Sequence, residues 1–213
     1  MARNTIEAAV MGCGKRGRLH ADGLKNIAGV RISAFADPVG KLARDMAADF
    51  PGAEAYTDPA LMLKEARPDF VVICTRPQAR LAPIRMCVDA GVGGIQCEKP
   101  MATSWNEALS IYELCQDHGV QLSFSHQRRF RADFRTARRL IQEGAIGKIE
   151  RLDAFCPNFY DWGTHWFDMM FFLLGDVRAS WILAQADFSE PRYVFDAPME
   201  TRGISRVHYE NDV

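Results

Sequence analysis

The chain has 213 residues, of which 48% are hydrophobic and 25% are charged, a composition typical of a soluble globular protein with one large domain or two small ones. Its formal net charge of −1 gives no overall attraction to nucleic acid or to an anionic membrane. The longest uncharged apolar run, Met169 to Leu174, is far too short to span a bilayer, and the first residues lack the apolar core of a signal peptide.

The six cysteines are scattered along the chain and form no CxxC pair. Most of them lie in apolar runs, where a thiol behaves as a small hydrophobic side chain. We therefore interpret them as reduced core residues and expect a cytoplasmic protein.

A glycine turn, Gly12-Cys13-Gly14-Lys15-Arg16-Gly17, follows the apolar run 6–11 and precedes a helix-compatible segment, 19–28. The next apolar run, 30–36, ends at Asp37, which lies 20 residues after Gly17. A dinucleotide-binding βαβ unit has this layout, in which a strand, a glycine turn, a helix and a second strand are followed by an acidic residue. A bare glycine pattern also fits an ordinary turn, but the spaced aspartate favours nucleotide binding.

Each glycine of this turn has its own reason to lack a side chain. Gly12 allows a tight turn, Gly14 lets the backbone approach a pyrophosphate, and Gly17 lets the helix pack close to the strand. The helix N-terminus then offers free N–H groups and a positive dipole end to the phosphates. An acid such as Asp37 accepts a hydrogen bond from the ribose 2′-OH of NAD and repels the 2′-phosphate of NADP.

Apolar patterning then alternates between short strands and helices as far as residue 124. Such alternation predicts a parallel sheet with right-handed crossovers. The predicted strands are 54–56, 70–74, 94–97 and 120–124. One predicted helix stops at 51–52, and two others end at 91 and 119. A further helix is predicted over 59–66, with Asp58-Pro59 at its start.

The helix that ends before Gly119 has a clear start signal, because Ser104 and Glu107 have capping-box spacing. We predict that one apolar stripe of this helix packs on the sheet. The stripe comprises Trp105, Ala108, Leu109, Tyr112 and Cys115.

The pattern changes after Ser125, where helices become fewer and strands longer. Residues 134–141 predict an amphipathic helix that ends near Gly144, and residues 161–174 a helix with a wide apolar face. Strands are predicted over 148–155, 178–188 and 203–209. We therefore expect an α/β fold with two domains: residues 1–125, a doubly wound parallel sheet, and residues 126–213, an incomplete α/β domain with a mostly antiparallel open sheet.

The first constellation that could carry chemistry is Glu98-Lys99-Pro100, at the carboxyl end of a predicted parallel strand. Ligands bind at that edge in such folds. A lysine there can hold a substrate oxygen, or share a proton with it if its pKa is lowered. The alternative is an ordinary surface lysine in a loop.

The second constellation is Asp161-Trp-Gly-Thr-His165, with Asp and His four residues apart and thus on one face of a helix. The carboxylate can orient the imidazole, an arrangement that suits a general base. A metal site formed by Asp161, His165 and Asp168 is a second interpretation, although the chain offers no clear further ligand. A helix with satisfied polar side chains is the third.

A basic run lies between these constellations. Nucleic-acid binding is the sharper interpretation of it, but no aromatic platform accompanies the run and the chain as a whole is not basic. We interpret most of the arginines as the solvated face of the helix over 134–141, with Arg128 and Arg129 still able to face a ligand. The run consists of Arg128, Arg129, Arg131, Arg135, Arg138 and Arg139.

These motifs together resemble the glucose-fructose oxidoreductase, inositol dehydrogenase and MocA-type (Gfo/Idh/MocA) oxidoreductases. The resemblance covers about residues 5–210. It rests on four motifs in order: GCGKRGRLH (12–20), FADP (35–38), VVICTRP (71–77) with IQCEKP (95–100), and DWGTHWFD (161–168).

The resemblance implies an NAD(P)-binding Rossmann domain followed by a domain for substrate binding and oligomerisation. The usual substrates are sugars, inositols and related polyols, and the usual assemblies are dimers or tetramers, so we expect a homo-oligomer. NAD is the expected cofactor, with NADP as the alternative because Arg76 could weaken the preference. The expected cofactor-binding residues are Gly12, Gly14, Lys15, Arg16, Gly17, Asp37, Thr75 and Glu98, with Glu98 near the nicotinamide.

The resemblance also implies a mechanism. The substrate hydroxyl lies between Lys99 and His165, His165 oriented by Asp161 takes its proton, and hydride leaves the same carbon for the nicotinamide. Lys99, His165 and Asp161 are then the catalytic residues, and Arg128 joins them as a substrate-binding residue.

The sequence departs from the family pattern in two places. Arg80 stands where the family usually has a histidine, so contacts to cofactor or substrate there should differ. The chain also stops in a predicted hairpin at Val213, whereas family members usually continue and complete the second sheet. We therefore interpret the sequence either as a C-terminally truncated fragment or as a naturally short relative of the family. A non-catalytic NAD(P)-binding or regulatory relative is the alternative function.

Overall fold

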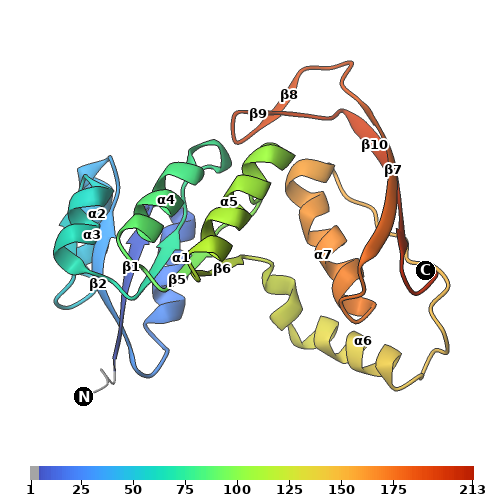
Figure 1. The fold of residues 1–213 in the computed structure, drawn as a ribbon, viewed down its shortest axis with the longest axis horizontal. Coiled ribbons are helices and arrows are strands. Elements are labelled where there is room, and N and C mark those ends of the chain that lie inside the picture. Colours follow the sequence, from blue (N-terminus) through green and yellow to red (C-terminus); the bar gives the residue numbers. More distant parts are fainter. Residues whose placement is uncertain (1–4) are drawn as a thin grey trace. The chain divides into compact units, whose positions relative to one another are not determined.

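A computed structural model describes residues 5–213 of the chain (Figure 1). The chain divides into two compact units, the first ending at Ser125 and the second spanning His126–Val213. Within the described residues, none of the helices has the length and apolar character needed to cross a membrane.

The first unit is built on a six-stranded sheet in which all paired strands are parallel. The strand order is β3-β2-β1-β4-β5-β6, the order of dinucleotide-binding folds, and it confirms the predicted doubly wound parallel sheet. The strands are β1 Ile6–Met11, β2 Val30–Ala36, β3 Glu54–Tyr56, β4 Phe70–Ile73, β5 Gly94–Cys97 and β6 Gln121–Phe124.

Helices alternate with these strands as the sequence predicts, although α1 begins four residues earlier than expected because Gly14 serves as its N-cap. The start of α3 follows the prediction closely, since the Asp58 carboxylate accepts a hydrogen bond from the Ala60 N–H at 2.8 Å. The helices are α1 Lys15–Leu24, α2 Gly40–Ala48, α3 Pro59–Ala66, α4 Leu81–Asp89 and α5 Trp105–Asp117, with the short 3-10 turn η1 Pro77–Ala79 before α4.

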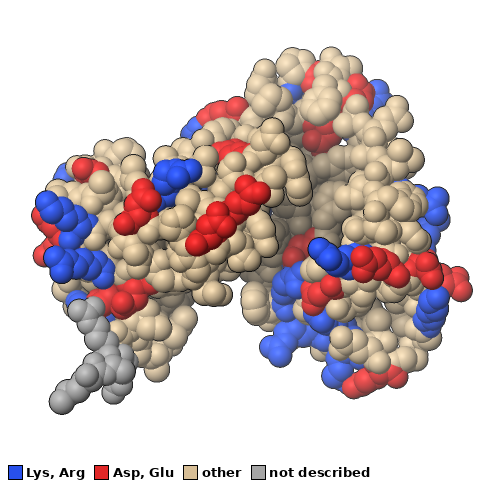
Figure 2. Space-filling view, viewed as in Figure 1, with Lys and Arg blue, Asp and Glu red and all other residues tan. Residues whose placement is uncertain are grey.

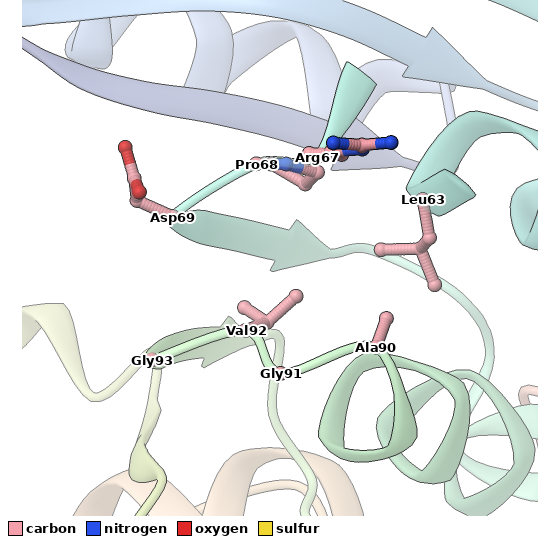
Figure 3. Close-up of a pocket in the computed structure, with 8 residues that line it drawn as sticks. All are labelled: Leu63, Arg67, Pro68, Asp69, Ala90, Gly91, Val92 and Gly93. Carbon is pink, nitrogen blue, oxygen red and sulfur yellow. The ribbon is translucent and has the colours of Figure 1, made fainter. Parts of the chain in front are cut away.

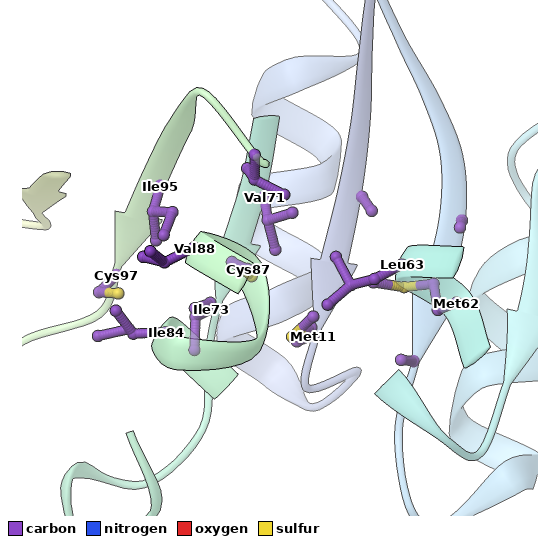
Figure 4. Close-up of a cluster of buried hydrophobic side chains, with 14 of the residues drawn as sticks. Met11, Met62, Leu63, Val71, Ile73, Ile84, Cys87, Val88, Ile95 and Cys97 are labelled. Carbon is purple, nitrogen blue, oxygen red and sulfur yellow. The ribbon is translucent and has the colours of Figure 1, made fainter. Parts of the chain in front are cut away.

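Two apolar clusters cover the two faces of this sheet, and successive residues of each central strand alternate between them. On β1, Ala9 and Met11 join the cluster with α3, α4 and α5, whereas Ala8 and Val10 join the cluster with α1 and α2. Figure 4 shows the first cluster, with the α4 side chains lying against those of β4 and β5. This burial on both faces explains why the strands read as continuous apolar runs.

The predicted stripe of α5 is wrong in part. The residues that face the core are Ile111 and Cys115, whereas Trp105 is 76% exposed and Tyr112 is 54% exposed. The helix carries large apolar side chains on two adjacent faces, so periodicity alone favoured the more aromatic one. The cap is confirmed, because the Ser104 hydroxyl accepts from the Glu107 N–H.

The second unit has helices first and strands afterwards, whereas the sequence predicted an additional strand between its two helices. The strands form two separate two-stranded antiparallel sheets, β7 with β10 and β8 with β9. The elements are η2 Gln127–Phe130, α6 Ala132–Gln142, the π turn η3 Phe159–Gly163, α7 Thr164–Leu173, β7 Ala179–Asp187, β8 Arg192–Val194, β9 Ala197–Met199 and β10 Arg202–Tyr209.

The predicted strand over 148–155 is wrong. The segment shows the exposure pattern of a strand, since Leu152 and Ala154 are half-buried while Arg151, Asp153 and Phe155 are exposed. However, no strand of residues 5–213 pairs with it. The alternation of apolar and polar residues therefore predicted which side chains are exposed. A β-strand also needs a hydrogen-bonded neighbour, and the sequence pattern does not provide one.

Candidate cofactor and catalytic sites

The register of the sheet brings the carboxyl ends of four strands into line. Ala36, Met11, Ile73 and Cys97 are successive neighbours across the ladder. The residues that come next therefore lie along one edge, around the place where the strand order reverses between β1 and β4, which is where such folds bind ligands. Those residues are Asp37, Gly12, Cys74 with Thr75, and Glu98.

The three glycines of the turn at this edge differ in how much space each has for a side chain. Gly12 has a φ of +92°, and a Cβ there would lie 2.9 Å from the Cys74 carbonyl carbon. A Cβ on Gly17 would collide with the Gly12 carbonyl oxygen, so the helix packs directly on the turn. A Cβ on Gly14, by contrast, would meet no atom within 4 Å. The turn thus leaves open backbone at Gly14, which fits the approach of a pyrophosphate.

The N-terminus of α1 is electropositive. Lys15 and Arg16 form its first turn, both are exposed, and that turn holds no acidic residue. Free N–H groups and the helix dipole add to these two charges. The arrangement fits an anionic diphosphate and needs no metal ion to hold one.

The Asp37 carboxylate is fixed beside this turn. The side chain is buried, one oxygen accepts from the Cys13 N–H and the other from the Val39 N–H, each at 2.8 Å. Each oxygen keeps a further lone pair for a ribose hydroxyl. The acid therefore also ties the end of β2 to the glycine turn, a structural role that spacing alone did not predict.

The thiols at this edge are not nucleophiles. Burial, followed by the charge of Asp37, raises the pKa of Cys13 to about 12. Burial, followed by the charge of Glu98, raises the pKa of Cys74 to about 12. All six cysteines are free, as predicted, and these two stay protonated at neutral pH.

Arg80, the departure from the family pattern, is turned into the protein. It is 1% exposed and donates to the backbone carbonyls of Thr75, at 2.7 Å, and of Pro100. The guanidinium therefore links the turn after β4 to the turn after β5. Sequence spacing marked the position as unusual but could not show that its charge is buried.

The turn after β5 carries Glu98 and Lys99. Glu98 is buried, and its Oε1 lies 2.9 Å from Nε2 of His20 on α1. Burial acts to raise the pKa of the Glu98 carboxyl, but the His20 hydrogen bond and the charges of Arg16, His20 and Lys99 outweigh it and lower the pKa. Glu98 is therefore a carboxylate at neutral pH, and half-buried Lys99 adjoins it.

A separate hollow lies at the opposite edge of the sheet, at the start of β4 and β5 (Figure 3). It is lined by residues such as Arg67, Asp69 and Gly93. Ligands in this class of fold bind beyond the carboxyl ends of the strands, so this hollow is not the candidate cofactor site.

In the second unit, Asp161 and His165 lie on consecutive elements. Asp161 is in the π turn η3 rather than in a regular helix, and Asn158 caps that turn by accepting from the Asp161 N–H at 2.8 Å and the Trp162 N–H at 3.0 Å. His165 lies in the first turn of α7, is 6% exposed, and meets the ring of His126 edge-on at 5.8 Å between centroids. The imidazole is thus held by packing.

Asp168 is part of an ion-pair cluster. Its Oδ1 accepts from Nε of Arg129 at 2.7 Å, and Arg129 and Arg138 also pair with Asp176. No metal-type cluster of His, Cys, Asp and Glu occurs within residues 5–213. The interpretation as a solvated face is therefore wrong for Arg138 of α6, which pairs with Asp176 just after α7. Arg129, which the sequence left able to face a ligand, instead links η2 to these acidic side chains.

Arg128 lies against aromatic rings. Its guanidinium carbon is 4.7 Å from the ring centroid of Trp166 and 5.8 Å from that of Trp162. Figure 2 shows basic and acidic side chains interleaved over the part of the second unit that holds α6, not a continuous basic surface.

Sequence reasoning missed several residues at these sites. His20 closes the glycine motif, four residues after Arg16 and thus on the same helix face, which is a signal that could have found it. Asn158 precedes the π turn as a cap residue would. Ser125 and His126 carry no sequence signal of their own, since only the fold brings them to His20 and His165.

Comparisons with known proteins agree with this geometry. The Gfo/Idh/MocA family model, described as an oxidoreductase family with an NAD-binding Rossmann fold, matches residues 6–126. Among curated relatives, 4-carboxy-2-hydroxymuconate-6-semialdehyde dehydrogenase of Sphingobium is 31% identical over 70% of this chain and 46% of its own length. Inositol 2-dehydrogenase of Rhizobium meliloti is 30% identical over 83% of this chain and 57% of its own length.

A D-apiose dehydrogenase of Paraburkholderia graminis is 29% identical over 81% of this chain and 50% of its own length, so the chain spans about half the length of these relatives. Among solved structures, an oxidoreductase from Agrobacterium radiobacter in complex with NAD+, L-tartaric acid and magnesium has a TM-score of 0.79 at 23% identity, covering 97% of this chain and 64% of that one. This likeness shows the shared fold. The chain belongs to the Gfo/Idh/MocA family of oxidoreductases with an NAD-binding Rossmann fold.

Proposed function

We propose that the first unit binds NAD and that the protein transfers a hydride between the nicotinamide and a hydroxyl carbon of a sugar, inositol or related polyol. One observation carries the cofactor assignment: the strand register aligns Asp37, the Gly12 turn and Glu98 along the carboxyl edge of the sheet. The substrate class is supported by relatives named for D-apiose and inositol.

The cofactor residues have distinct tasks in this proposal. The backbone at Gly14, together with Lys15 and Arg16, binds the pyrophosphate. Asp37 accepts from the adenosine ribose, which favours NAD over NADP. Thr75 and Glu98 bind toward the nicotinamide end. When bound, the nicotinamide supplies or accepts the hydride.

The protein's own residues orient the substrate and handle the proton. Lys99 holds the reacting oxygen and His165 takes the hydroxyl proton, or returns it in the reverse direction. Asp161 steadies the imidazole in its charged form, and Arg128 contributes a further substrate contact. Family resemblance and residue chemistry support these roles.

A turnover assay tests the proposal. Absorbance of the reduced nicotinamide is followed with NAD and a panel of sugars, inositols and polyols, together with a carboxylated semialdehyde like the substrate named for one relative. We expect turnover with at least one member. NAD binding by calorimetry without turnover on the whole panel would contradict the enzyme assignment and favour a non-catalytic NAD-binding relative.

Two substitutions test the residue roles. Lys99→Ala and His165→Ala should abolish turnover and leave NAD affinity nearly unchanged, because neither side chain is assigned to the cofactor. Lys148→Ala and His118→Ala, at exposed positions, are the matched controls and should keep wild-type turnover. Loss of NAD binding in the Lys99 or His165 variant would show that the residue has been misplaced.

We also propose that the protein is a homo-oligomer, as the family resemblance implies. Light scattering coupled to size-exclusion chromatography should give a mass of at least two chains of 23.9 kDa. A single-chain mass across micromolar concentrations would overturn this part of the proposal.

A further inference from the structure

His20 joins α1 to the turn that carries Glu98. Its Nε2 lies 2.9 Å from Oε1 of Glu98 and 3.3 Å from the hydroxyl of Ser125, which follows β6. The ring is therefore held between the ends of β5 and β6, on the helix whose N-terminus forms the glycine turn.

The partners fix the tautomer of the neutral ring. An ionised carboxylate can only accept hydrogen bonds, so Nε2 must carry the hydrogen that it donates to Glu98. A proton taken up by the ring then goes to Nδ1, and the hydrogen bond to Glu98 survives protonation. The geometry thus keeps the pair together while its net charge changes from −1 to zero.

Ser125 extends this contact into a chain of polar groups. The Gln96 amide donates to the Ser125 hydroxyl at 3.0 Å, and the Ser123 hydroxyl donates to the Gln96 carbonyl at 2.7 Å. The Ser125 side is thus built from neutral groups. The charged and titratable groups around the pair are Glu98 itself, Arg16 on α1, Lys99 in the same turn, and the Cys74 thiol after β4.

We propose that His20 is a positioning residue for Glu98, which holds this carboxylate toward the nicotinamide and cancels its negative charge when the imidazole gains a proton. The inference rests on the proposed function, which assigns Glu98 to the nicotinamide end. The ring of NAD+ carries a positive charge and that of NADH does not. An anionic Glu98 therefore favours the oxidised cofactor, and protonation of His20 removes that preference.

Calorimetric titrations with NAD+ and NADH between about pH 5.5 and 8 test this inference. In the wild type, the preference for NAD+ over NADH should grow with pH by ~3- to 10-fold. The His20→Gln variant keeps an amide donor but has no titrating charge, so it should hold the high-pH preference at every pH. The Glu98→Gln variant should favour NAD+ over NADH less than the wild type does at every pH, because the carboxylate charge is gone. The exposed His118→Gln variant is the control and should retain the wild-type slope.

ADP-ribose, which lacks the nicotinamide, separates the two ends of the cofactor. Its affinity should be the same in the wild type and in His20→Gln, His20→Ala and Glu98→Gln. An equal loss of ADP-ribose and NAD+ affinity in Glu98→Gln would place Glu98 away from the nicotinamide. A wild-type pH slope in His20→Gln would overturn the role of His20.

A titration of the free protein keeps this inference separate from the proposed function. The carboxyl carbon of Glu98 is followed by NMR with carbon-13 glutamate, its signal identified by its loss in Glu98→Gln. His20→Ala should raise the pKa of Glu98, because burial remains and the hydrogen bond is lost. An unchanged Glu98 pKa would refute the inference. Failure of both nucleotides to bind would instead contradict the proposed function.

Discussion

In the first unit, β5 is paired on both sides and its Ile95 is fully buried, whereas in the second unit eight of the nine residues of β7 are exposed. The candidate chemistry of the two units is held in correspondingly different ways. Strand register fixes the position of Glu98, while His165 follows a π turn capped by Asn158 and sits on a helix tied by Arg129. The hydrophobic core positions the candidate site of the first unit, whose sheet is buried on both faces. The candidate residues of the second unit, whose two-stranded sheet of β7 and β10 is largely exposed, depend on local polar contacts.

The broadest effect, on both stability and NAD binding, is expected at the closest contact of the first unit. Gly17→Ala places a methyl group against the Gly12 carbonyl oxygen, so the first unit should lose about 3 kcal/mol of unfolding free energy together with NAD binding. Gly14→Ala, in the same turn, meets no protein atom and should cost less than about 1 kcal/mol while still weakening NAD binding. Denaturant unfolding and calorimetry check both. Equal destabilisation by the two changes would contradict the described turn.

A second pair of substitutions measures the difference between the sheets. Ile95→Ala should cost about 2–5 kcal/mol, because it leaves a cavity in a fully buried strand. Ile182→Ala on β7, where the side chain is 64% exposed, should change the stability of the chain by no more than about 0.5 kcal/mol. A cost for Ile182→Ala close to that for Ile95→Ala would show that β7 is covered in the folded protein.

The ion pairs of the second unit come next. Arg129→Met leaves Asp168 and Asp176 without one of their cationic partners and should cost about 1–2 kcal/mol, because these side chains are only partly buried. Arg135→Met is the matched control on the neighbouring helix α6, where the side chain is exposed, and should cost less than about 0.5 kcal/mol. Thermal unfolding of the two variants under one buffer compares them.

These ion pairs also predict acid sensitivity. Burial acts to raise the pKa of Asp176, but hydrogen bonds from Arg129 and Arg138 outweigh it and hold the pKa below the ordinary value of 3.8. A depressed carboxyl pKa contributes stability above the unfolded value and loses it as pH falls through the folded value. The wild type should therefore weaken below about pH 4, and Arg129→Met should weaken less over that range. A parallel decline in both proteins would argue against the pairing.

The smallest predicted effect concerns a helix cap. Ser104→Ala removes the acceptor of the Glu107 N–H and should cost about 1 kcal/mol. Ser110→Ala, at an exposed position further along α5, should be neutral or slightly stabilising because alanine favours the helix. Denaturant midpoints distinguish the two, and an equal cost would show that the cap contributes nothing specific.

The contrast between the units also separates what the sequence predicted from what it did not. Strands β1, β2, β3 and β5 match their predicted bounds, because glycine or proline residues lie close to their ends. The prediction of a strand over 148–155 was wrong, because alternation of apolar and polar residues indicates which side chains are buried but not which strand would pair with the segment.

The candidate site divides in the same way. The spacing of the glycine turn and Asp37 predicted their positions, and the structure adds that the Asp37 carboxylate accepts hydrogen bonds from the Cys13 and Val39 N–H groups. The neighbours His20 and Ser125 lie 105 residues apart, a contact that no local pattern specifies. Arg80 shows the same limit, because only the fold reveals that its charge is buried between two turns.

We propose that the carboxyl edge of the first unit binds NAD through the glycine turn and Asp37. A calorimetric titration of NAD and NADP into the wild type and an Asp37→Ser variant tests this proposal directly. We expect NAD to bind the wild type at one site per chain, at least about tenfold more tightly than NADP, and the preference to disappear in Asp37→Ser. Absence of binding by either nucleotide, or a preference for NADP in the wild type, would contradict the account.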